Sequence, residues 1–542
     1  MTKVSERSGG EILAQGLKSH GVDTIFCVPG ESYLAVLDGF YDLRDDINVV
    51  TCRQEGGAAY MAEAYGKLKG TPGICFVTRG PGATNASIGV HTAYQDSTPM
   101  ILFIGQVARH QEDREAFQEI DYRRMYGEMA KWVAQIETAD RIPEYLNRAF
   151  HTATSGRPGP VVLALPEDML TEMATVVDTP AYKKVASAPR PEDMEQFRSL
   201  LAEAQNPLLL IGGGGWSVEA SQNITRFAED NSLPVACAFR RQDSFDNHHE
   251  LFVGEVGIAP NPRLAEQVQN SDLLIAVGPR LGEMTTSGYS LLDSPNTKQK
   301  LVHVLPGAEE LNRVYNAELA ILSDLTAFTK AVASLKPVVN PVWKASVSQA
   351  RSDYHEFIGV ELGIKDFPMH KISSYLRDNL PSDAIITNGA GNYTIWGQRF
   401  YQFTSYPSQL APTSGAMGYG VPAGIGAKIA EPNRTVVTFA GDGCFMMNGQ
   451  EIATAVQHNA NVIIIVVDNG CFGTIRMHQE REYPDRVIST KLNNPDFAAL
   501  ARAYGAYAET VEEADQFPAA FERARESNQP ALIHMKVPNL WE

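Results

Sequence analysis

Short, continuous hydrophobic runs alternate with longer segments of helical pattern from one end of the chain to the other. The runs fall at residues 24–28, 74–78, 100–104, 161–165, 207–211, 234–237, 273–277, 301–304, 384–387, 435–439, 462–467 and 531–535. A strand that is hydrophobic at every position is buried on both faces, as in parallel sheets that helices cover on either side. The pattern therefore predicts an α/β protein with doubly wound parallel sheets.

Two proline-containing stretches, residues 171–192 and 336–366, interrupt this alternation. Proline clusters in aperiodic sequence are typical of linkers. We therefore predict three domains of ordinary size, at residues 1–175, 190–336 and 365–542. Ligands of doubly wound domains bind beyond the carboxyl ends of the strands, so motifs that directly follow a strand are the first candidates for a site.

Composition narrows the class of protein. The 542 residues carry 46 Lys and Arg against 64 Asp and Glu, a net charge of −18, and 44% of them are hydrophobic. This balance predicts a folded chain that binds neither nucleic acid nor an anionic membrane surface. The polar N-terminus resembles no signal peptide, and no hydrophobic run approaches the ~18 residues that cross a bilayer. The six cysteines have no CxxC spacing, so we expect buried thiols in the reducing cytoplasm.

The strongest chemical signal lies in one predicted strand–helix–strand unit. The strand at residues 435–439 runs into Gly441, Asp442 and Gly443, and the next strand ends at Asp468 and Asn469. Glycines permit a tight turn whose N–H groups can hold a phosphate. A right-handed crossover brings the two strand ends together, so the Asp442 carboxylate and the Asn469 amide can converge on Mg²⁺ beside a diphosphate. The alternative is a glycine-rich turn followed by an ordinary Asn-Gly turn.

This unit resembles the thiamine-diphosphate motif, which pairs a Gly-Asp-Gly turn with an asparagine one helix and one strand later. The resemblance extends to segments that look like those of acetolactate synthases and their relatives, at residues 53–59 (RQEGGAA), 78–85 (TRGPGATN), 105–107 (GQV), 116–119 (AFQE) and 414–427 (SGAMGYGVPAGIGA). The chain is therefore identified as a member of the thiamine-diphosphate-dependent enzymes, in the acetolactate-synthase-like branch of the pyruvate oxidase and decarboxylase superfamily. The resemblance implies a pyrimidine-binding, a central and a diphosphate-binding domain, with thiamine diphosphate and Mg²⁺ as cofactors.

The resemblance also assigns roles to single residues. Glu55 would be the catalytic residue, because the family's glutamate at this place hydrogen-bonds the aminopyrimidine ring and drives the imino tautomer that activates the cofactor. Its other interpretation is an acid that stabilises a helix N-terminus. Met417 would bend the cofactor and Gly415 would offer it a carbonyl, although methionines commonly fill a core. The other cofactor contacts would be Gly391, Asn392, Tyr393, Gly441, Gly443 and Cys444, and the metal ligands would be Asp442, Asn469 and the carbonyl of Cys471.

Substrate contacts are expected from two distant parts of the chain. The candidates are Glu31, Arg79, Phe117, Gln118, Thr474 and Ile475. Glu31 either relays protons or is a solvated loop acid. Arg79 either binds a substrate carboxylate as a fork-like donor or forms a surface ion pair.

The sequence differs from the family's pattern in features that affect two predictions: whether a flavin is bound, and which branch of the family the chain resembles. Flavin-binding acetolactate synthases carry an acidic strand end resembling HIDID, where this chain has HVLPG at residues 303–307. The glycine turn at residues 212–215 could still hold a nucleotide, so flavin adenine dinucleotide (FAD) stays an open alternative with little support. His478 stands where biosynthetic synthases carry a tryptophan, and the chain lacks their longer closing tail; the resemblance therefore favours another member of the branch.

We expect an enzyme, a carboligase or decarboxylase of the transferase or lyase class, that forms or cleaves a C–C bond of a 2-oxo acid or an acyloin. Two alternatives stay open: a lyase of the benzaldehyde-lyase or oxalyl-coenzyme-A-decarboxylase type, and a catalytically silent paralogue that binds the cofactor. The resemblance further implies a homodimer or homotetramer with active sites between chains. The sequence names neither the substrate nor the direction of the reaction.

Overall fold

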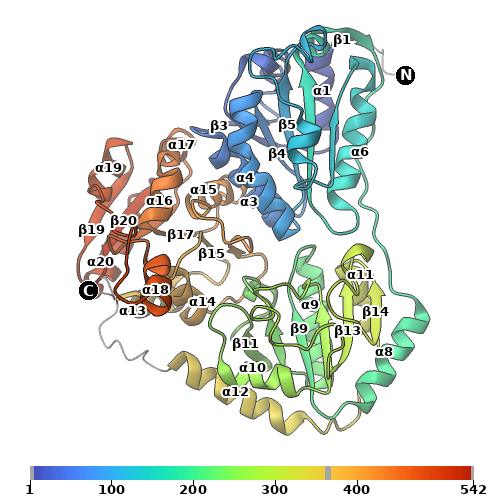
Figure 1. Ribbon diagram of the computed structural model, residues 1–542, viewed down its shortest axis with the longest axis vertical. Coiled ribbons are helices and arrows are strands. Elements are labelled where there is room, and N and C mark those ends of the chain that lie inside the picture. The colour runs from blue at the N-terminus through green and yellow to red at the C-terminus, as the bar shows by residue number, and fades with distance from the viewer. Residues whose placement is uncertain (1–4, 360–367, 539–542) are drawn as a thin grey trace.

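Three α/β domains make up the protein. The computed structural model describes residues 5–359 and 368–538. Each domain contains one six-stranded parallel sheet covered by helices, and the three domains form a triangle, with the N-terminal domain in blue, the central domain in green to yellow and the C-terminal domain in brown to red (Figure 1). The predicted fold class is confirmed, and each sheet falls inside one of the three ranges predicted as domains.

The N-terminal sheet has the strand order β3-β2-β4-β5-β7-β6. Alternate residues of its strands enter two separate cores: Ile101 and Phe103 of β5 pack with α1, α2 and α6, whereas Leu102 and Ile104 pack with α3 and α4. This two-sided burial explains why the strands are hydrophobic at consecutive positions. The strands are β2 (Thr24–Cys27), β3 (Asn48–Thr51), β4 (Gly73–Val77), β5 (Met100–Gln106), β6 (Trp132–Gln135) and β7 (Pro160–Pro166), and the helices are α1 (Gly9–Ser19), α2 (Leu34–Tyr41), α3 (Glu55–Lys69), α4 (Gly80–Asp96), α5 (Tyr122–Tyr126), α6 (Ile142–Thr154) and α7 (Glu167–Thr171).

The central sheet has the order β11-β10-β9-β12-β13-β14, which is 3-2-1-4-5-6 in the domain's own count. This is the order of dinucleotide-binding folds, whose ligands lie where the chain switches direction between the first and fourth strands. Its strands are β9 (Pro207–Ile211), β10 (Val235–Cys237), β11 (Phe252–Glu255), β12 (Leu273–Val277), β13 (Lys300–Leu305) and β14 (Leu319–Leu322), and its helices are α8 (Pro191–Glu203), α9 (Val218–Asn231), α10 (Pro262–Asn270), α11 (Leu325–Val332) and α12 (Lys344–Gly359).

The C-terminal sheet, ordered β16-β15-β17-β18-β20-β19, repeats the topology of the N-terminal one. Its switch point lies between β15 and β17, which are adjacent and parallel. The strands are β15 (Ile385–Asn388), β16 (Gln409–Leu410), β17 (Val436–Gly441), β18 (Ile463–Asp468), β19 (Tyr507–Val511) and β20 (Ala531–Lys536), and the helices are α13 (Pro368–Asn379), α14 (Tyr393–Phe400), α15 (Gly420–Ala430), α16 (Asp442–Asn448), α17 (Ile452–Gln457), α18 (Gly473–Glu482), α19 (Phe497–Ala503) and α20 (Phe517–Glu526).

The two predicted linkers contain more regular structure than their sequences indicate. In the first, β8 (Met173–Thr175) pairs antiparallel with β1 (Glu6–Ser8). The second holds α12, a helix of 16 residues, along the lower edge of the molecule (Figure 1). Its buried residues Val347, Ala350 and Tyr354 pack on the central domain, so tertiary packing forms a helix where the pattern indicates aperiodic chain.

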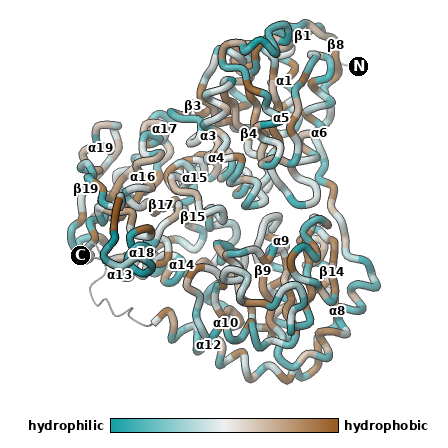
Figure 2. The backbone as a smooth tube through the Cα atoms, viewed as in Figure 1, coloured by the Kyte–Doolittle hydropathy of each residue, from teal (hydrophilic) through white to brown (hydrophobic). Residues whose placement is uncertain are grey.

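One hydrophobic core runs through both the N-terminal and the C-terminal domain. Helices α3 and α15 pack against each other, and the Tyr60 and Tyr419 rings meet edge to face with centroids 5.3 Å apart. In Figure 2 hydrophobic residues, drawn brown, follow strands inside the domains, while many peripheral turns are hydrophilic. Among the described residues, no helix combines the length and the hydrophobicity needed to span a membrane.

Candidate active site

A cavity of about 250 Å³ lies beyond the carboxyl ends of β15, β17 and β18. This is the switch point of the C-terminal sheet, where ligands of such folds bind. Thirteen residues proposed from the sequence line it together: Gly391, Asn392, Tyr393, Gly415, Met417, Gly441, Asp442, Gly443, Cys444, Asn469, Cys471, Thr474 and Ile475.

Asp442 is the first residue of α16 and is only 3% exposed. Its Oδ1 accepts the Gly443 N–H at 2.7 Å, and its Oδ2 accepts from Asn494 Nδ2 at 2.8 Å and from the Cys471 N–H at 3.2 Å. A Cβ atom on Gly443 would lie 2.4 Å from the Phe472 ring. Only glycine at position 443 therefore lets the Phe472 ring pack this closely against the start of α16.

The charges around Asp442 fit a bound cation. Burial raises the pKa of Asp442 to about 6, and the neighbouring Asp468 charge adds to that rise. Asp442, Asn469 and Cys471 all line this cavity, and between them they contain carboxylate, amide and backbone oxygens, the hard donors that Mg²⁺ takes alongside phosphate oxygens. Among the described residues, no group of three or more His, Cys, Asp or Glu side chains could hold a metal, so a cation here would depend on this mixed set.

The other predicted site residues gather elsewhere, at the carboxyl edge of the N-terminal sheet. Glu55 begins α3, where its Oε2 accepts from Asn85 Nδ2 at 2.9 Å. Arg79 caps α4 and forms an ion pair with Glu167 at 3.6 Å. None of these residues lines the 250 Å³ cavity of the same chain.

Residues 117 and 118 belong to this N-terminal group. The Gln118 carbonyl accepts the Gly80 N–H at 3.0 Å, next to Arg79. The Phe117 side chain is 76% exposed. Glu31 is exposed at the end of the turn that follows β2. The structure thus divides the predicted site into two halves.

Family models of the thiamine pyrophosphate enzymes match all three domains. The N-terminal thiamine-pyrophosphate-binding domain matches residues 7–125, the central domain residues 194–332 and the C-terminal thiamine-pyrophosphate-binding domain residues 389–535. The chain belongs to the thiamine pyrophosphate enzyme family. The C-terminal cavity and the Glu55 edge fall in the two domains that this family uses to bind the cofactor.

Similar members of the family are acetolactate synthases. The chain is 31% identical over 540 residues to the acetolactate synthase isozyme 2 large subunit of Escherichia coli (strain K12), over 98% of this chain and 96% of that protein. It is 32% identical over 552 residues to the probable acetolactate synthase large subunit of Methanocaldococcus jannaschii, over 98% and 92% of the two chains. The acetolactate synthase large subunit of Corynebacterium glutamicum is 31% identical, over 98% and 87%.

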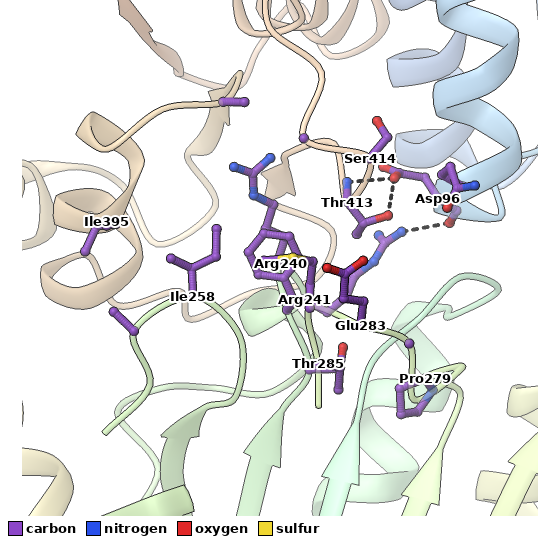
Figure 3. A pocket seen from close by; sticks show the side chains of 18 of the residues that line it. Asp96, Arg240, Arg241, Ile258, Pro279, Glu283, Thr285, Ile395, Thr413 and Ser414 are labelled. Carbon is purple, nitrogen blue, oxygen red and sulfur yellow. Dashed lines mark hydrogen bonds between the residues drawn. The ribbon is translucent and has the colours of Figure 1, made fainter. Parts of the chain in front are cut away.

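A second, larger cavity of about 870 Å³ lies where the three domains of this thiamine pyrophosphate enzyme meet (Figure 3). It shares Gly391, Asn392, Gly415 and Thr474 with the smaller cavity, so the two are adjacent. Its lining includes the arginines Arg240, Arg241, Arg280 and Arg481 and the histidines His91 and His478.

The switch point of the central sheet borders this larger cavity. Its residues do not provide the contacts that the resemblance implies for a flavin dinucleotide. A Cβ on Gly213 would lie 2.0 Å from the Gly278 carbonyl oxygen, and one on Gly214 would lie 2.6 Å from that of Ser97. Close packing of backbone on backbone therefore accounts for these glycines. At the end of β13, Leu305 and Pro306 provide no side-chain acceptor for a ribose hydroxyl.

Sequence reasoning misses several residues that shape the site. Asn494 Nδ2 bridges Asp442 Oδ2 at 2.8 Å and Asp468 Oδ1 at 2.7 Å. Phe472 lines the cavity beside Gly443. Arg240, from the central domain, lies close enough to Tyr393 and Cys444 to interact with them electrostatically. Asn494 and Arg240 follow no recognisable motif, and their roles arise from contacts between segments far apart in the chain.

Proposed function

We propose that the protein is a thiamine-diphosphate-dependent carboligase, similar to acetolactate synthases, that acts on a 2-oxo acid or an acyloin. The observation that carries the proposal is the C-terminal cavity, because residues predicted from separate motifs between positions 391 and 475 line a single space. The acetolactate synthase relatives, which align with 98% of the chain, support the same class of reaction.

We propose that the C-terminal cavity holds the diphosphate end of the cofactor. Gly441, Gly443 and Cys444 would surround the diphosphate, with Asp442, Asn469 and the Cys471 carbonyl as ligands of Mg²⁺. The glycine turn at residues 441–443 and the position of all six residues on one cavity support these roles. Bound thiamine diphosphate supplies a stabilised carbanion for attack on a substrate carbonyl.

Met417 and Gly415 would position the cofactor rings, and Thr474 and Ile475 would line the substrate side. Gly391, Asn392 and Tyr393, at the start of α14, would complete the cradle. Thr474 Oγ1 donates to Asn392 Oδ1 at 2.9 Å and accepts the Asn392 N–H at 3.0 Å, so α14 and α18 hold each other on either side of the cavity. These helices would orient the substrate and exclude water.

Glu55 would reach the cofactor from a second copy of the chain. In one chain Glu55 lies outside the C-terminal cavity, which supports a homodimer, or a homotetramer built from two such dimers, with each site between an N-terminal edge and a partner's C-terminal cavity. Glu31, Arg79, Phe117 and Gln118 would enter the site with it.

A substrate panel tests the reaction. With thiamine diphosphate and Mg²⁺, we expect the purified protein to consume 2-oxo acids such as pyruvate and to form a carboligation product, identified by mass spectrometry. Glu55→Gln should abolish turnover while the cofactor still binds, because an amide cannot share the proton that activates the ring. Glu6→Gln, a change of an exposed residue in the same domain, serves as the control.

Other results of the substrate panel would identify one of the alternative functions. Cleavage of benzoin or oxalyl-coenzyme A without carboligation would identify a lyase. Binding of the cofactor with slow exchange of its C2 proton would identify a silent paralogue, and full turnover by Glu55→Gln would contradict the role of Glu55.

The proposal also covers the absence of bound flavin and the cellular location of the protein. We expect no flavin bands in the purified protein, because the end of β13 lacks an acid. All six cysteines are buried and none is in a disulfide, which supports a reducing, cytoplasmic location.

A further inference from the structure

Residues 411–418, here called the clamped loop, are held by side chains from all three domains. From the N-terminal domain, Lys67 Nζ donates to the Ala411 carbonyl at 2.8 Å, and Asp96 Oδ1 accepts the Thr413 N–H at 2.7 Å. From the central domain, Arg240 Nη1 donates to the Pro412 carbonyl at 2.5 Å. The clamped loop also carries Gly415 and Met417, which line the candidate cofactor cavity.

The far end of the clamped loop is fixed as well. Tyr60 Oη lies 3.4 Å from the Met417 carbonyl, and Asn448 Nδ2 donates to the Gly418 carbonyl at 3.0 Å. Gly415 and Gly418 have φ of +67° and +77°, so the loop turns through left-handed conformations that side chains disfavour. External hydrogen bonds, in place of regular secondary structure, therefore determine its course.

The charges that hold the loop are buried. Lys67 and Asp96 form an ion pair of 2.6 Å with side chains 4% and 0% exposed. Burial alone would raise the pKa of Asp96, but Lys67 and Arg241 lower it below its ordinary value, so the carboxylate stays ionised and accepts strongly from Thr413. Figure 3 shows Thr413 and Arg241 both reaching Asp96, while Arg240 points away from it.

Arg240 is 1% exposed, and within the described residues its Nε has no hydrogen-bond partner. Burying a guanidinium is costly, and a hydrophobic side chain of similar volume commonly gives equal or greater stability. The stability of the central domain therefore does not explain the arginine. The contact of Arg240 with the Pro412 carbonyl, three residues before Gly415, does explain why an arginine is present.

We infer that Arg240, together with the buried Lys67–Asp96 pair, positions the clamped loop so that Gly415 and Met417 meet the cofactor in a fixed geometry. Arg240 is a positioning residue that acts through Pro412, and the central domain thereby takes part in cofactor binding. The inference rests on the proposed function, because it assumes that the loop contacts thiamine diphosphate.

The test compares two arginines that both donate to backbone carbonyls. Arg240→Met removes the bond to Pro412, whereas Arg351→Met, on α12, removes a guanidinium that donates to the Phe252 carbonyl at 2.8 Å and to the Asn247 and His248 carbonyls at 3.1 Å, all in the central domain and none in the loop. Calorimetric titration of each full-length variant with thiamine diphosphate in Mg²⁺ gives the Kd. Near-ultraviolet circular dichroism reports the conformation of the bound cofactor, and thermal unfolding reports the fold.

We expect Arg240→Met to weaken cofactor binding about tenfold or more and Arg351→Met to stay within about twofold of wild type, since only the first variant loses a hydrogen bond from a charged donor to the clamped loop. Arg240→Lys should restore part of the affinity and of the dichroism. Equal effects of the two methionine variants, or wild-type binding by Arg240→Met, would overturn the inference.

Two further variants keep the test decisive. If Arg240→Met does not fold, Thr413→Val replaces it; this variant removes only the hydroxyl that bonds Asp96, and wild-type binding by it would also overturn the inference. Met417→Ala probes the loop contact directly. If wild-type protein binds no cofactor, the proposed function fails; if Met417→Ala weakens binding and Arg240→Met does not, the inference fails alone.

Discussion

At the scale of single residues, a histidine on the neighbouring strand provides a partner for the half-buried acid at position 468. His534 Nε2 on β20 lies 2.8 Å from Asp468 Oδ2 on β18. Burial would raise the pKa of Asp468, but hydrogen bonds from His534 and Asn494 lower it below its ordinary value. The charge of Asp468 thus has partners on an adjacent strand and in Asn494. Because Asn494 also donates to Asp442, the two carboxylates are joined through one amide group.

Glu255 gives a pH-dependent stability that can be measured. Burial raises the pKa of Glu255 from its ordinary 4.5 to about 8. As the pH rises through this window, the unfolded chain loses the proton that the folded chain keeps, so the stability contributed by the protonated carboxyl is lost. Glu255→Gln removes the carboxyl, and we expect its melting temperature to exceed that of wild type by an amount that grows from about pH 4.5 to about pH 8.

Thermal unfolding across this pH range provides the measurement. Glu219→Gln, a change of an exposed glutamate on α9 of the same domain, should show a constant difference from wild type. A constant difference for Glu255→Gln as well would contradict the prediction.

At the scale of elements, helix α15 depends on glycines because it lies between the C-terminal sheet and α3. A Cβ on Gly420 would come within 2.9 Å of the Phe439 carbonyl oxygen on β17, and one on Gly426 within 2.9 Å of the Met61 carbonyl oxygen on α3. A glycine-rich helix is intrinsically weak. Packing on both sides compensates, and it fixes the helix that directly follows the clamped loop.

Gly424 and Gly397 form a matched pair for testing this packing. A Cβ at Gly424 would lie 2.1 Å from Thr438 Oγ1, whereas nothing lies within 4 Å of a Cβ at Gly397 in α14. We expect Gly424→Ala to destabilise the protein by about 1–3 kcal/mol through overpacking, and Gly397→Ala to stabilise it by about 0.5–1 kcal/mol through reduced chain entropy. Denaturant unfolding of both variants provides the measurement, and shifts of the same sign would contradict the account.

At the scale of the whole molecule, the arrangement of three sheets keeps Glu55 apart from the cavity that contains Asp442. Arg53 and Gln54, just before Glu55, donate backbone N–H groups to Glu451 Oε1 at 3.1 and 2.9 Å. These contacts fix the start of α3 against the C-terminal domain of its own chain. A composite site would therefore need a second copy of the protein.

Mixing two inactive variants tests that arrangement. Glu55→Gln and Asp442→Asn, each purified alone, should be inactive for different reasons. Co-expression of the two should restore part of the activity, because a mixed dimer has one site with both residues intact. If each site lay within one chain, no mixture would be active, and that result would contradict a site shared between chains. Size-exclusion chromatography with light scattering gives the oligomeric state of each sample.

The sequence by itself determined the inner strands of each sheet and the motif formed by Gly441, Asp442, Gly443 and Asn469. The twelve hydrophobic runs are the four inner strands of each sheet, because only strands with neighbours on both edges and helices on both faces are hydrophobic throughout. Edge strands such as β6 and β19 include partly exposed positions and leave no such run. Gly441, Asp442 and Asn469 could be found because one strand–helix–strand unit brings them together within a short segment.

Only the tertiary structure decided which residues share a space. It placed Glu55 away from Asp442, joined Asn494 to Asp442, and brought Arg240 and the Lys67–Asp96 pair onto the clamped loop. These contacts link segments far apart in the chain, several of them from different domains, so no local periodicity or spacing encodes them. Packing three domains around a common junction selects them, and a buried charge is stable there only where a distant segment supplies its partner.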